Sequence, residues 1–366
     1  MRLLGLNLEN FRNLRSQNLK FQTDRIFFIG ENGQGKSNLL EAIGICSSLR
    51  SFRGASTGAM VSEGEIHSRL FATFLDDDGT AREALISFGA KGGKQVEVDG
   101  EPVKKLGDFL GQFPSVSMSS RDFRLVRESP SDRRKWMDLL LSSTSAQYLN
   151  ALQGYYRSMK GRNVLLKKQA GDAEISAFEH TLASSAMVIQ EIRAQLFPSI
   201  EPSFENAYRV LSSSKESATM RHLPDCSEED TDHWLELYAR ERPRDRIVGM
   251  TRKGPHRDDF SLFLDGRDAK EYGSEGQQKG VVLSLRIAEF YYLRKSLGRL
   301  PILLADDVLG ELDKMRRANF RNLLPTESQT FASGTTYPSE REKEIWETFL
   351  LEGGTVQSSA GNLGNG

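Results

Sequence analysis

One short segment limits what this chain can fold into more than any other. Residues 30–37 read Gly-Glu-Asn-Gly-Gln-Gly-Lys-Ser and fit the pattern G-x-x-x-x-G-K-[ST] at each fixed position. Residues 25–29 form an apolar run before it, and residues 38–49 behind it carry apolar side chains at helical spacing. A glycine-rich turn between a buried strand and a helix aims backbone N–H groups and the helix dipole at phosphate oxygens. The segment therefore predicts a P-loop in an α/β fold, and its flanks disfavour a glycine-rich turn without a ligand.

Two side chains of this loop have distinct chemical roles. We expect the ammonium of Lys36 to reach the β- and γ-phosphates and the hydroxyl of Ser37 to ligate Mg²⁺. ATP and Mg²⁺ are therefore the expected cofactors. The residues expected to surround the nucleotide are Gly30, Glu31, Asn32, Gly33, Gln34, Gly35, Lys36, Ser37 and Asn38.

A second segment is predicted to be a buried strand with acidic residues at its C-terminal end. Residues 301–307 read Pro-Ile-Leu-Leu-Ala-Asp-Asp, which is an apolar strand that ends in two carboxylates. In a parallel sheet such a strand presents its acids beside the P-loop. We expect Asp306 to hold Mg²⁺, directly or through water, and Asp307 to position or activate the attacking water, so that Asp307 and Lys36 are the expected catalytic residues. Apolar strands that end in Asp are common, so this interpretation depends on a third segment.

The third segment, residues 272–279, reads Tyr-Gly-Ser-Glu-Gly-Gln-Gln-Lys and precedes an apolar helix expected over 281–297. It resembles the signature motif of ABC ATPases, in which a second helix N-terminus meets the γ-phosphate held by a partner subunit. Ser274, Gly276 and Gln277 are the expected contacts, and they predict an ATP-dependent homodimer. The alternative is an ordinary helix capped by Ser274. The order of P-loop, signature and acidic strand favours the phosphate site, as does the D-loop-like segment 309–313.

These motifs, together with segments spread over almost the whole chain, resemble the RecF family of bacterial DNA replication and repair proteins, small relatives of the SMC ATPases. Residues 254–259, Gly-Pro-His-Arg-Asp-Asp, are more diagnostic of the family than the P-loop is. The other matching segments are residues 8–13, 38–43, 50–53 and 129–134. The chain departs from the family at Glu275 and Lys279, where Gln and Arg are expected. In the final strand, residues 329–336, Ser333 or Thr335 occupies the region where many ABC ATPases place a switch histidine.

The resemblance implies a fold and a function. The expected fold is an α/β ABC-type ATPase head built from both chain ends, with an inserted, mainly helical lobe. The expected function is slow, DNA-stimulated ATP hydrolysis coupled to binding of single-stranded, gapped or junction DNA in recombinational repair and replication restart. The expected partners are DNA and repair proteins of the RecR and RecO kind. Lys36 and Ser274 lie 238 positions apart, and no sustained heptad fills this span, so we expect a compact clamp without long coiled-coil arms.

Changes in sequence character predict the domain boundaries. We expect the N-terminal part of the head over 1–125, a helical lobe over 126–246, the C-terminal part of the head over 247–352 and a disordered tail over 353–366. Residues 70–117 alternate apolar and polar side chains between turns, whereas helix formers dominate from about 130. Strand character returns at 246–249 and at 260–264, and the last residues are rich in Gly, Ser and Asn.

Composition excludes several classes of protein. The two cysteines, Cys46 and Cys226, lie too far apart in sequence to indicate a disulfide framework or a zinc site. Neither a signal peptide nor a long apolar run is evident, so we expect a cytoplasmic protein with no membrane partner. The net charge of −1 gives no support for nucleic-acid binding, so the distribution of charge matters more.

A cluster of cations without an acid is the best candidate for contact with DNA phosphates. It spans residues 155–168, and the alternative is an ordinary solvated face. Its members are Arg157, Lys160, Arg162, Lys167 and Lys168.

Two other functions remain open at this point, namely an ABC transport ATPase subunit and a nucleotide switch that scarcely hydrolyses ATP. The long insert and the missing switch histidine disfavour the first. The short side chain of Asp307 keeps the second open. Arg53 is as consistent with a nucleotide contact as with a surface arginine, and no role for His256 follows from the sequence.

Overall fold

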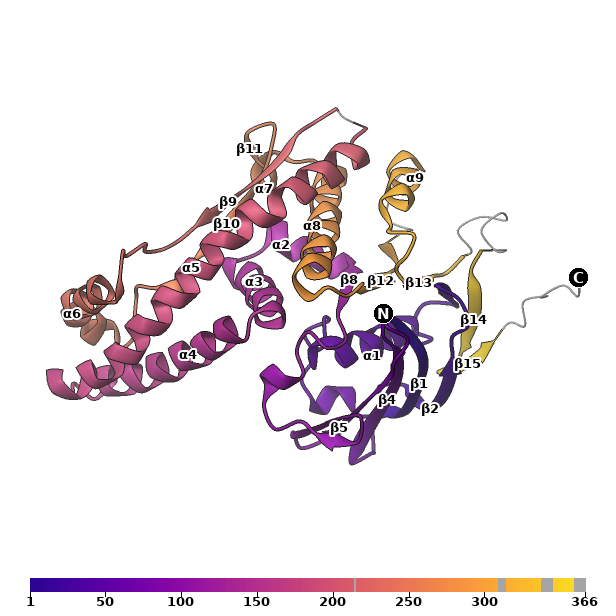
Figure 1. Cartoon of the computed structure of the whole chain (residues 1–366), viewed down its shortest axis with the longest axis horizontal. Coiled ribbons are helices and arrows are strands. Elements are labelled where there is room, and N and C mark those ends of the chain that lie inside the picture. The colour runs from indigo at the N-terminus through magenta and orange to yellow at the C-terminus, as the bar shows by residue number, and fades with distance from the viewer. Residues whose placement is uncertain (214, 309–313, 337–344, 359–366) are drawn as a thin grey trace, which may run out of the picture. The chain divides into compact units, whose positions relative to one another are not determined.

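The computed structural model describes residues 1–213, 215–308, 314–336 and 345–358 (Figure 1). The chain forms two compact units. Unit 1 comprises Met1–Asp122, Val210–Ser214 and Val282–Gly366, and unit 2 comprises Phe123–Arg209 and Lys215–Val281. The chain passes from unit 1 to unit 2 after Asp122, close to the predicted boundary at 125. It returns to unit 1 for good only after Val281, so residues 247–281, which we expected in the head, belong to the helical unit instead.

One sheet of unit 1 is antiparallel. Its strands follow the order β2-β1-β4-β5-β6-β7. The predicted strands between residues 70 and 98 are confirmed, because alternate side chains of β4 and β5 are buried. The strand bounds are β1 Arg2–Phe11, β2 Leu14–Lys20, β4 His67–Leu75, β5 Ala81–Gly89, β6 Lys94–Val98 and β7 Glu101–Pro102.

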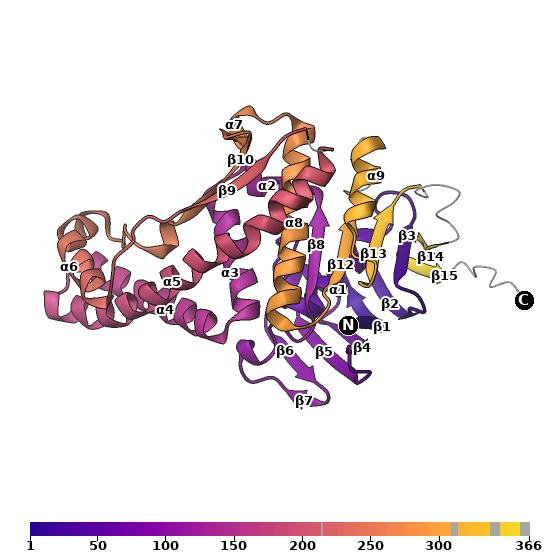
Figure 2. The ribbon, with the colours of Figure 1, turned by 45° about the horizontal axis from the view of Figure 1, so that its top comes forward.

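The second sheet of unit 1 draws strands from both ends of the chain. Its order is β15-β14-β3-β13-β12-β8, and the neighbours from β14 to β8 are parallel. Figure 2 shows β8, β12, β13 and β3 side by side. The bounds are β3 Arg25–Ile29, β8 Ser115–Ser119, β12 Ile302–Asp306, β13 Thr330–Gly334, β14 Glu347–Glu352 and β15 Thr355–Ser358. This sheet confirms the predicted ABC-type head made from both chain ends.

The predicted start of the disordered tail is wrong. Residues 353 and 354 form a turn, and Thr355–Ser358 is the strand β15, which pairs antiparallel with β14. The remaining part of that prediction, residues 359–366, lies outside the described residues.

Helix α1, Lys36–Ser48, is buried between the two sheets of unit 1. Apolar side chains of β1 and β4 and of β12 and β13 belong to the same core cluster as Leu39, Leu40 and Ile43. The helix that follows the P-loop is therefore covered on nearly all sides. The other helices of unit 1 are η1 Gly58–Met60, η2 Leu106–Asp108, α9 Lys314–Leu323 and the part of α8 from Val282 to Leu297.

Unit 2 combines long helices with a small antiparallel sheet of order β11-β10-β9. The strand predicted at 246–249 is wrong, because residues up to Val248 continue α6 and Gly249 ends it at φ 73°. Within the described ranges, no helix is both long and apolar enough to cross a membrane. The bounds in this unit are α2 Arg124–Arg127, α3 Pro130–Thr144, α4 Ala146–Lys167, α6 Thr231–Val248, η4 Pro255–Arg257, α7 Ala269–Tyr272, β9 Ala218–Leu223, β10 Asp259–Leu264 and β11 Arg267–Asp268. Residues of η3 Ser120–Phe123, α5 Asp172–Leu211 and α8 Glu275–Leu297 belong partly to unit 1 and partly to unit 2.

The Gly-Pro-His-Arg-Asp-Asp run at 254–259 is a structural junction of unit 2. The buried carboxylate of Asp258 accepts from Arg193 at 2.7 Å, and the half-buried carboxylate of Asp259 accepts from Arg133 at 2.6 and 2.8 Å. A Cβ on Gly254 would lie 2.4 Å from the Tyr155 hydroxyl, so only glycine fits there. The run therefore holds α3, α4 and α5 to the small sheet.

His256 also has a packing role. Its Nδ1 lies 2.7 Å from the Tyr155 hydroxyl, and its Nε2 lies 3.1 Å from the Thr251 carbonyl oxygen. A carbonyl only accepts, so Nε2 carries the proton and Nδ1 accepts from Tyr155. Burial lowers the pKa of His256 to about 4. The imidazole is therefore a neutral bridge within unit 2.

Candidate functional site

Two glycines allow the P-loop to adopt its shape. Gly35, the cap of α1, has φ 111°, which L side chains rarely adopt. At the other end of the loop, a Cβ on Gly30 would lie 2.5 Å from the backbone oxygen of Leu351. The loop therefore turns directly from β3 into α1, with the N-terminus of α1 facing the enclosed space.

The ammonium of Lys36 lies inside the loop. It donates to the carbonyl oxygens of Gly30 and Glu31, each at 2.7 Å. Burial lowers the pKa of Lys36, and the charges of Asp307 and Asp306 oppose that shift. The side chain is thus a buried cation held by two backbone carbonyl oxygens, and the charges of two carboxylates act on it.

A serine–aspartate–serine cluster joins three segments at one edge of the parallel sheet. Ser37 Oγ donates to Asp306 Oδ1 at 2.7 Å, and Ser333 Oγ donates to the same oxygen at 2.9 Å. The register explains the meeting, because Asp306 of β12 pairs with Ser333 of β13, and Ser333 pairs with Phe28 of β3. The carboxyl ends of parallel strands therefore bring together residues more than two hundred positions apart in the sequence.

Asp307 follows this cluster in a strained backbone conformation. Its φ is 55°, and its backbone N–H donates to Ser333 Oγ at 3.1 Å. Partial burial and the neighbouring Asp306 charge raise the pKa of Asp307, whereas Lys36 lowers it. Ser333 therefore contacts both acidic residues, and Thr335, the other residue in the switch region, is exposed. The D-loop-like segment 309–313 lies outside the described residues.

A polar chain behind the P-loop was not predicted. The amide of Asn13 donates to the Gly33 carbonyl at 3.3 Å and accepts from Asn38 at 2.7 Å. Asn38 in turn accepts from Arg53 at 2.6 Å. Arg53, for which the sequence left two roles open, thus supports Asn38. The only signal in the sequence was that Asn13 and Arg53 belong to segments that resemble the RecF family.

The expected signature segment belongs to unit 2 and forms a capping box at the start of α8. The backbone N–H of Ser274 donates to Gln277 Oε1 at 2.7 Å, and the backbone N–H of Gln277 donates to Ser274 Oγ at 3.3 Å. Gln277 Nε2 also donates to Glu216 at 2.7 Å. Ser274 is exposed, so the helix N-terminus is capped and still faces solvent. Without nucleotide, the start of α8 is therefore a capped helix, as in the alternative interpretation. The same exposed N-terminus is compatible with a contact to phosphate.

The two departures from the family pattern pair with each other. Glu275 and Lys279 form an ion pair at 3.0 Å, one turn apart on α8. The Lys279 ammonium also lies 5.5 Å from the centre of the Phe123 ring. The added negative charge of Glu275 is therefore partly balanced by Lys279.

The predicted cluster of DNA-binding cations on α4 is wrong at one position. Arg162 has no exposed surface and binds Glu179 at 3.0 Å and Asp245 at 2.7 Å. A guanidinium enclosed by two carboxylates cannot contact DNA. The sequence was misleading because Arg162 lies among cations that are exposed. The cluster that remains is Arg157, Lys160, Lys167 and Lys168.

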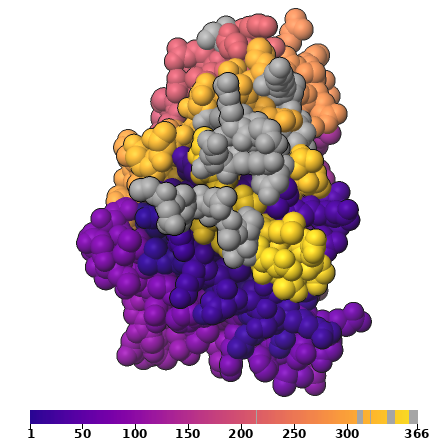
Figure 3. Space-filling model, turned by 90° about the vertical axis from the view of Figure 1, so that its right-hand side faces the viewer, coloured from indigo at the N-terminus to yellow at the C-terminus, as the bar shows by residue number. Residues whose placement is uncertain are grey.

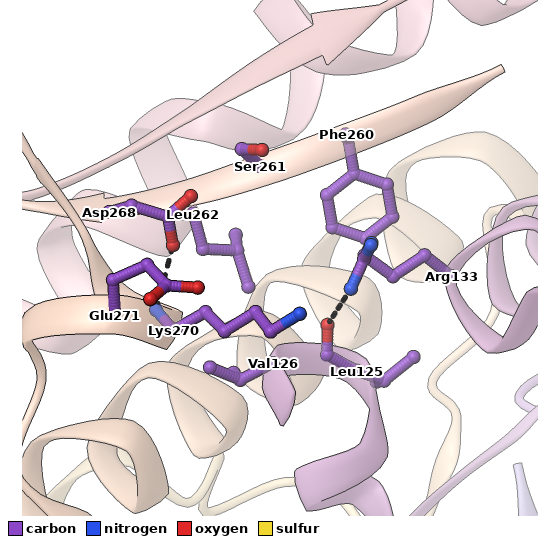
Figure 4. A pocket seen from close by; sticks show the side chains of 9 residues that line it. All are labelled: Leu125, Val126, Arg133, Phe260, Ser261, Leu262, Asp268, Lys270 and Glu271. Atoms are coloured by element: carbon purple, nitrogen blue, oxygen red, sulfur yellow. Dashed lines mark hydrogen bonds between the residues drawn. The ribbon is translucent and has the colours of Figure 1, made fainter. Parts of the chain in front are cut away.

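A pocket of about 220 Å³ lies within unit 2 between α2, α7 and β10 (Figure 4). Arg133 at its wall is bound by the Leu125 carbonyl oxygen and by Asp259. Asp268 caps the short helix α7 through the Lys270 N–H. These polar groups stabilise the local fold. All residues that line the pocket belong to unit 2, whereas the P-loop belongs to unit 1.

The model of the RecF/RecN/SMC N terminal domain family matches residues 2–336. The DNA replication and repair protein RecF of Synechococcus sp. strain JA-3-3Ab is 33% identical, over 92% of this chain and 91% of its own length. That of Leptospira biflexa is 34% identical, over 98% of this chain and 99% of its own length.

Solved structures show the same likeness. A structure of the recombination mediator protein RecF with ATP in the RecFOR pathway has a TM-score of 0.89 and 28% identity, and covers 98% of this chain and 97% of that one. An Smc head bound to the C-winged helix domain of ScpA has a TM-score of 0.56 at 15% identity, and covers 98% of this chain and 97% of that one, so it shows the fold alone.

The P-loop after β3, the acidic pair after β12 and the shared head fold define a P-loop ATPase of the ABC class. Within that class, the chain belongs to the RecF family of DNA replication and repair proteins. The transport-subunit and non-hydrolysing alternatives are not favoured by these relatives.

Proposed function

We propose that this chain is an ATP-dependent DNA-binding protein of recombinational repair and replication restart, which dimerises with ATP and hydrolyses it slowly. The observation that carries this proposal is the cluster of Ser37, Asp306 and Ser333 beside the buried ammonium of Lys36. RecF relatives named for DNA replication and repair support the biological role.

The P-loop binds the triphosphate. Its backbone N–H groups and the N-terminus of α1 face the phosphate oxygens, and Lys36 exchanges its two carbonyl partners for the β- and γ-phosphates. The proposed contacts, in addition to Lys36, are Gly30, Glu31, Asn32, Gly33, Gln34, Gly35, Ser37 and Asn38.

Ser37 and Asp306 fit Mg²⁺. Both offer hard oxygen donors, and their side-chain oxygens lie 2.7 Å apart. Among the described residues no group of three or more His, Cys, Asp or Glu is placed to hold a metal, which suits an ion bound by one carboxylate, a hydroxyl and substrate phosphates. Bound Mg²⁺ would neutralise charge that develops on the phosphate oxygens.

Asp307 is the residue that positions the attacking water. It follows Asp306 at the strand end, and its raised pKa makes the carboxylate more basic than an ordinary aspartate. The negative charge of Asp306 raises the pKa of Asp307, and the positive charge of Lys36 lowers it.

ATP joins two copies of the chain. Ser274, Gly276 and Gln277 at the exposed start of α8 in one copy meet the γ-phosphate bound by Lys36 of the other. ADP lacks that phosphate and releases the dimer, which makes the assembly a nucleotide-dependent switch.

DNA contacts the exposed face and the C-terminal cap of α4 through the four remaining cations, and they neutralise phosphates without reading the base sequence. The RecFOR pathway named for the RecF structure supports partners of the RecR and RecO kind. A cytoplasmic site of action is compatible with relatives named for DNA replication and repair.

Binding to gapped, single-stranded and duplex oligonucleotides, with and without ATP and at two salt concentrations, tests the proposal. We expect ATP to tighten binding to at least one of these DNAs and DNA to stimulate hydrolysis. Equal DNA affinity with ATP, with ADP and without nucleotide would refute the coupling.

A further inference from the structure

The turn between β14 and β15 lies against the P-loop, although more than three hundred residues separate them. The backbone N–H of Gly353 donates to Gln34 Oε1 at 2.6 Å. The backbone oxygen of Leu351, in β14, is the atom that leaves no room for a Cβ on Gly30. Figure 3 shows the yellow residues at the end of the described chain against the indigo residues of the N-terminus. The hairpin therefore touches the loop at Gly30 and at Gln34.

The turn between β1 and β2 connects the same two segments a second time. Asn13 donates to the Gly33 carbonyl, and a Cβ on Gly354 would lie 2.4 Å from the Asn13 backbone oxygen. Gln17 of β2 donates to the Gly354 carbonyl at 3.0 Å and accepts from the Val356 N–H at 3.1 Å. P-loop, β1–β2 turn and hairpin turn thus form a closed set of contacts within unit 1.

Gln34 stands between two glycines of the loop. Glycines with φ 85° and φ 111°, Gly33 and Gly35, stand on either side of it, so the backbone there has wide conformational freedom. Phosphate binding requires several N–H groups to point to one place, and the entropy of ordering them opposes binding. The bond from Gly353 removes part of that freedom before the ligand arrives.

We propose that the β14–β15 turn is a positioning element of the nucleotide site, which holds the P-loop in its phosphate-binding shape through the Gln34 side chain. This inference rests on the proposed nucleotide site. The backbone of Gln34 faces the phosphates, whereas its side chain serves the hairpin. Because linkage is reciprocal, a nucleotide that orders the loop also orders the turn.

Two measurements test this proposal. Titration with a fluorescent ADP reports how the turn affects nucleotide binding, and hydrogen exchange of the segment 346–358 reports how the nucleotide affects the turn. Gln34→Met keeps the size of the side chain and removes the acceptor. We expect it to weaken ADP binding by about two- to tenfold, the contribution of one ordinary hydrogen bond. In the unmodified chain ADP slows exchange in the segment, and in Gln34→Met it does not.

Two further variants make the result specific. Gln17→Met removes the other anchor of the hairpin without touching the P-loop, and we expect it to weaken ADP binding in the same direction. Gln357→Met makes the same substitution at an exposed position of β15, and we expect normal affinity and normal slowing of exchange. Normal ADP affinity in Gln34→Met, or exchange in the unmodified chain that ADP does not change, overturns the inference. Failure of the unmodified chain to bind ADP overturns the nucleotide site itself.

Discussion

The hydroxyl of Ser333 lies 2.9 Å from Asp306 Oδ1 and 3.1 Å from the backbone nitrogen of Asp307. One side chain thus orients the proposed Mg²⁺ ligand and fixes the backbone that carries the water-positioning carboxylate. A hydroxyl performs this role because it donates to one group and accepts from the other.

Ser333→Ala should therefore slow hydrolysis more than it weakens ATP binding. The variant leaves Asp306 with one donor fewer and the Asp307 N–H without its acceptor, and we expect kcat to fall by about tenfold. Ser333→Thr keeps the hydroxyl and retains most of the activity. Thr335→Val alters the exposed hydroxyl nearby and serves as the matched control. Equal kcat in Ser333→Ala and Thr335→Val would remove the role of Ser333.

Asp307→Asn should bind ATP and hydrolyse it at least about a hundredfold more slowly, because it keeps the size of the side chain and removes the base. The raised pKa of Asp307 means that its ionised form costs the fold stability at neutral pH. The melting temperature of the nucleotide-free variant should thus be unchanged or higher. Single-turnover hydrolysis and thermal melting measure the two effects, and unaltered turnover would assign the water to another residue.

Replacing Arg157, Lys160 and Lys168 by Glu should weaken DNA binding and flatten its dependence on salt. Each DNA phosphate that the variant no longer neutralises lowers the slope of log K against log salt by about 0.7 to 0.9. Fluorescence anisotropy across a salt series measures both quantities. Wild-type affinity in the triple variant would make α4 an ordinary solvated face.

Arg162→Met is the contrasting variant on the same helix. It leaves the buried Asp245 without its cation and Glu179 with Arg242 alone, and we expect a loss of about 3–5 kcal/mol in the free energy of unfolding. DNA affinity of the folded fraction, and its salt slope, should stay normal. A slope that falls with Arg162→Met while stability is unchanged would contradict its place in the core.

His256 should make unit 2 sensitive to acid. Its pKa of about 4 lies below the ordinary value of 6.5, so between these values the unfolded chain takes up a proton that the folded chain does not. Stability is lost as the pH falls from 6.5 to about 4, by about 1–2 kcal/mol at pH 5. Urea titrations at pH 7.5 and pH 5 should show a smaller acid loss in His256→Gln. An equal loss in both proteins would place the acid sensitivity elsewhere.

The elements that carry the proposed nucleotide site could be predicted from the sequence because their signals are local. The P-loop, the strand before Asp306 and the start of α8 each depend on a few neighbouring residues, and these elements lie where we expected them. The approach of the P-loop and Asp306 also followed, because the carboxyl ends of parallel strands share an edge.

The errors arose where distant residues decide the outcome. Gly353–Ser358 is polar and glycine-rich, and only its pairing with β14 and with Gln17 and Gln34 makes it part of the sheet. Arg162 lies in a run of cations, yet its partners come from α5 and α6. Ile247 and Val248 have strand propensity, but they extend a helix that already exists.

The central claim is that ATP joins two copies through Ser274 and Lys36. Ser274→Arg should bind ATP as a monomer, and Lys36→Met should bind it poorly, so each variant alone hydrolyses little. A mixture contains dimers in which the P-loop of the Ser274→Arg copy meets the intact signature of the Lys36→Met copy, and this single site should restore part of the hydrolysis.

Light scattering of the unmodified chain and of Ser274→Arg, with ATP and with ADP, measures this claim most directly. We expect a dimer for the unmodified chain with ATP, and monomers for the unmodified chain with ADP and for Ser274→Arg with either nucleotide. A dimer that forms without ATP, or a Ser274→Arg chain that dimerises normally with ATP, would contradict the account.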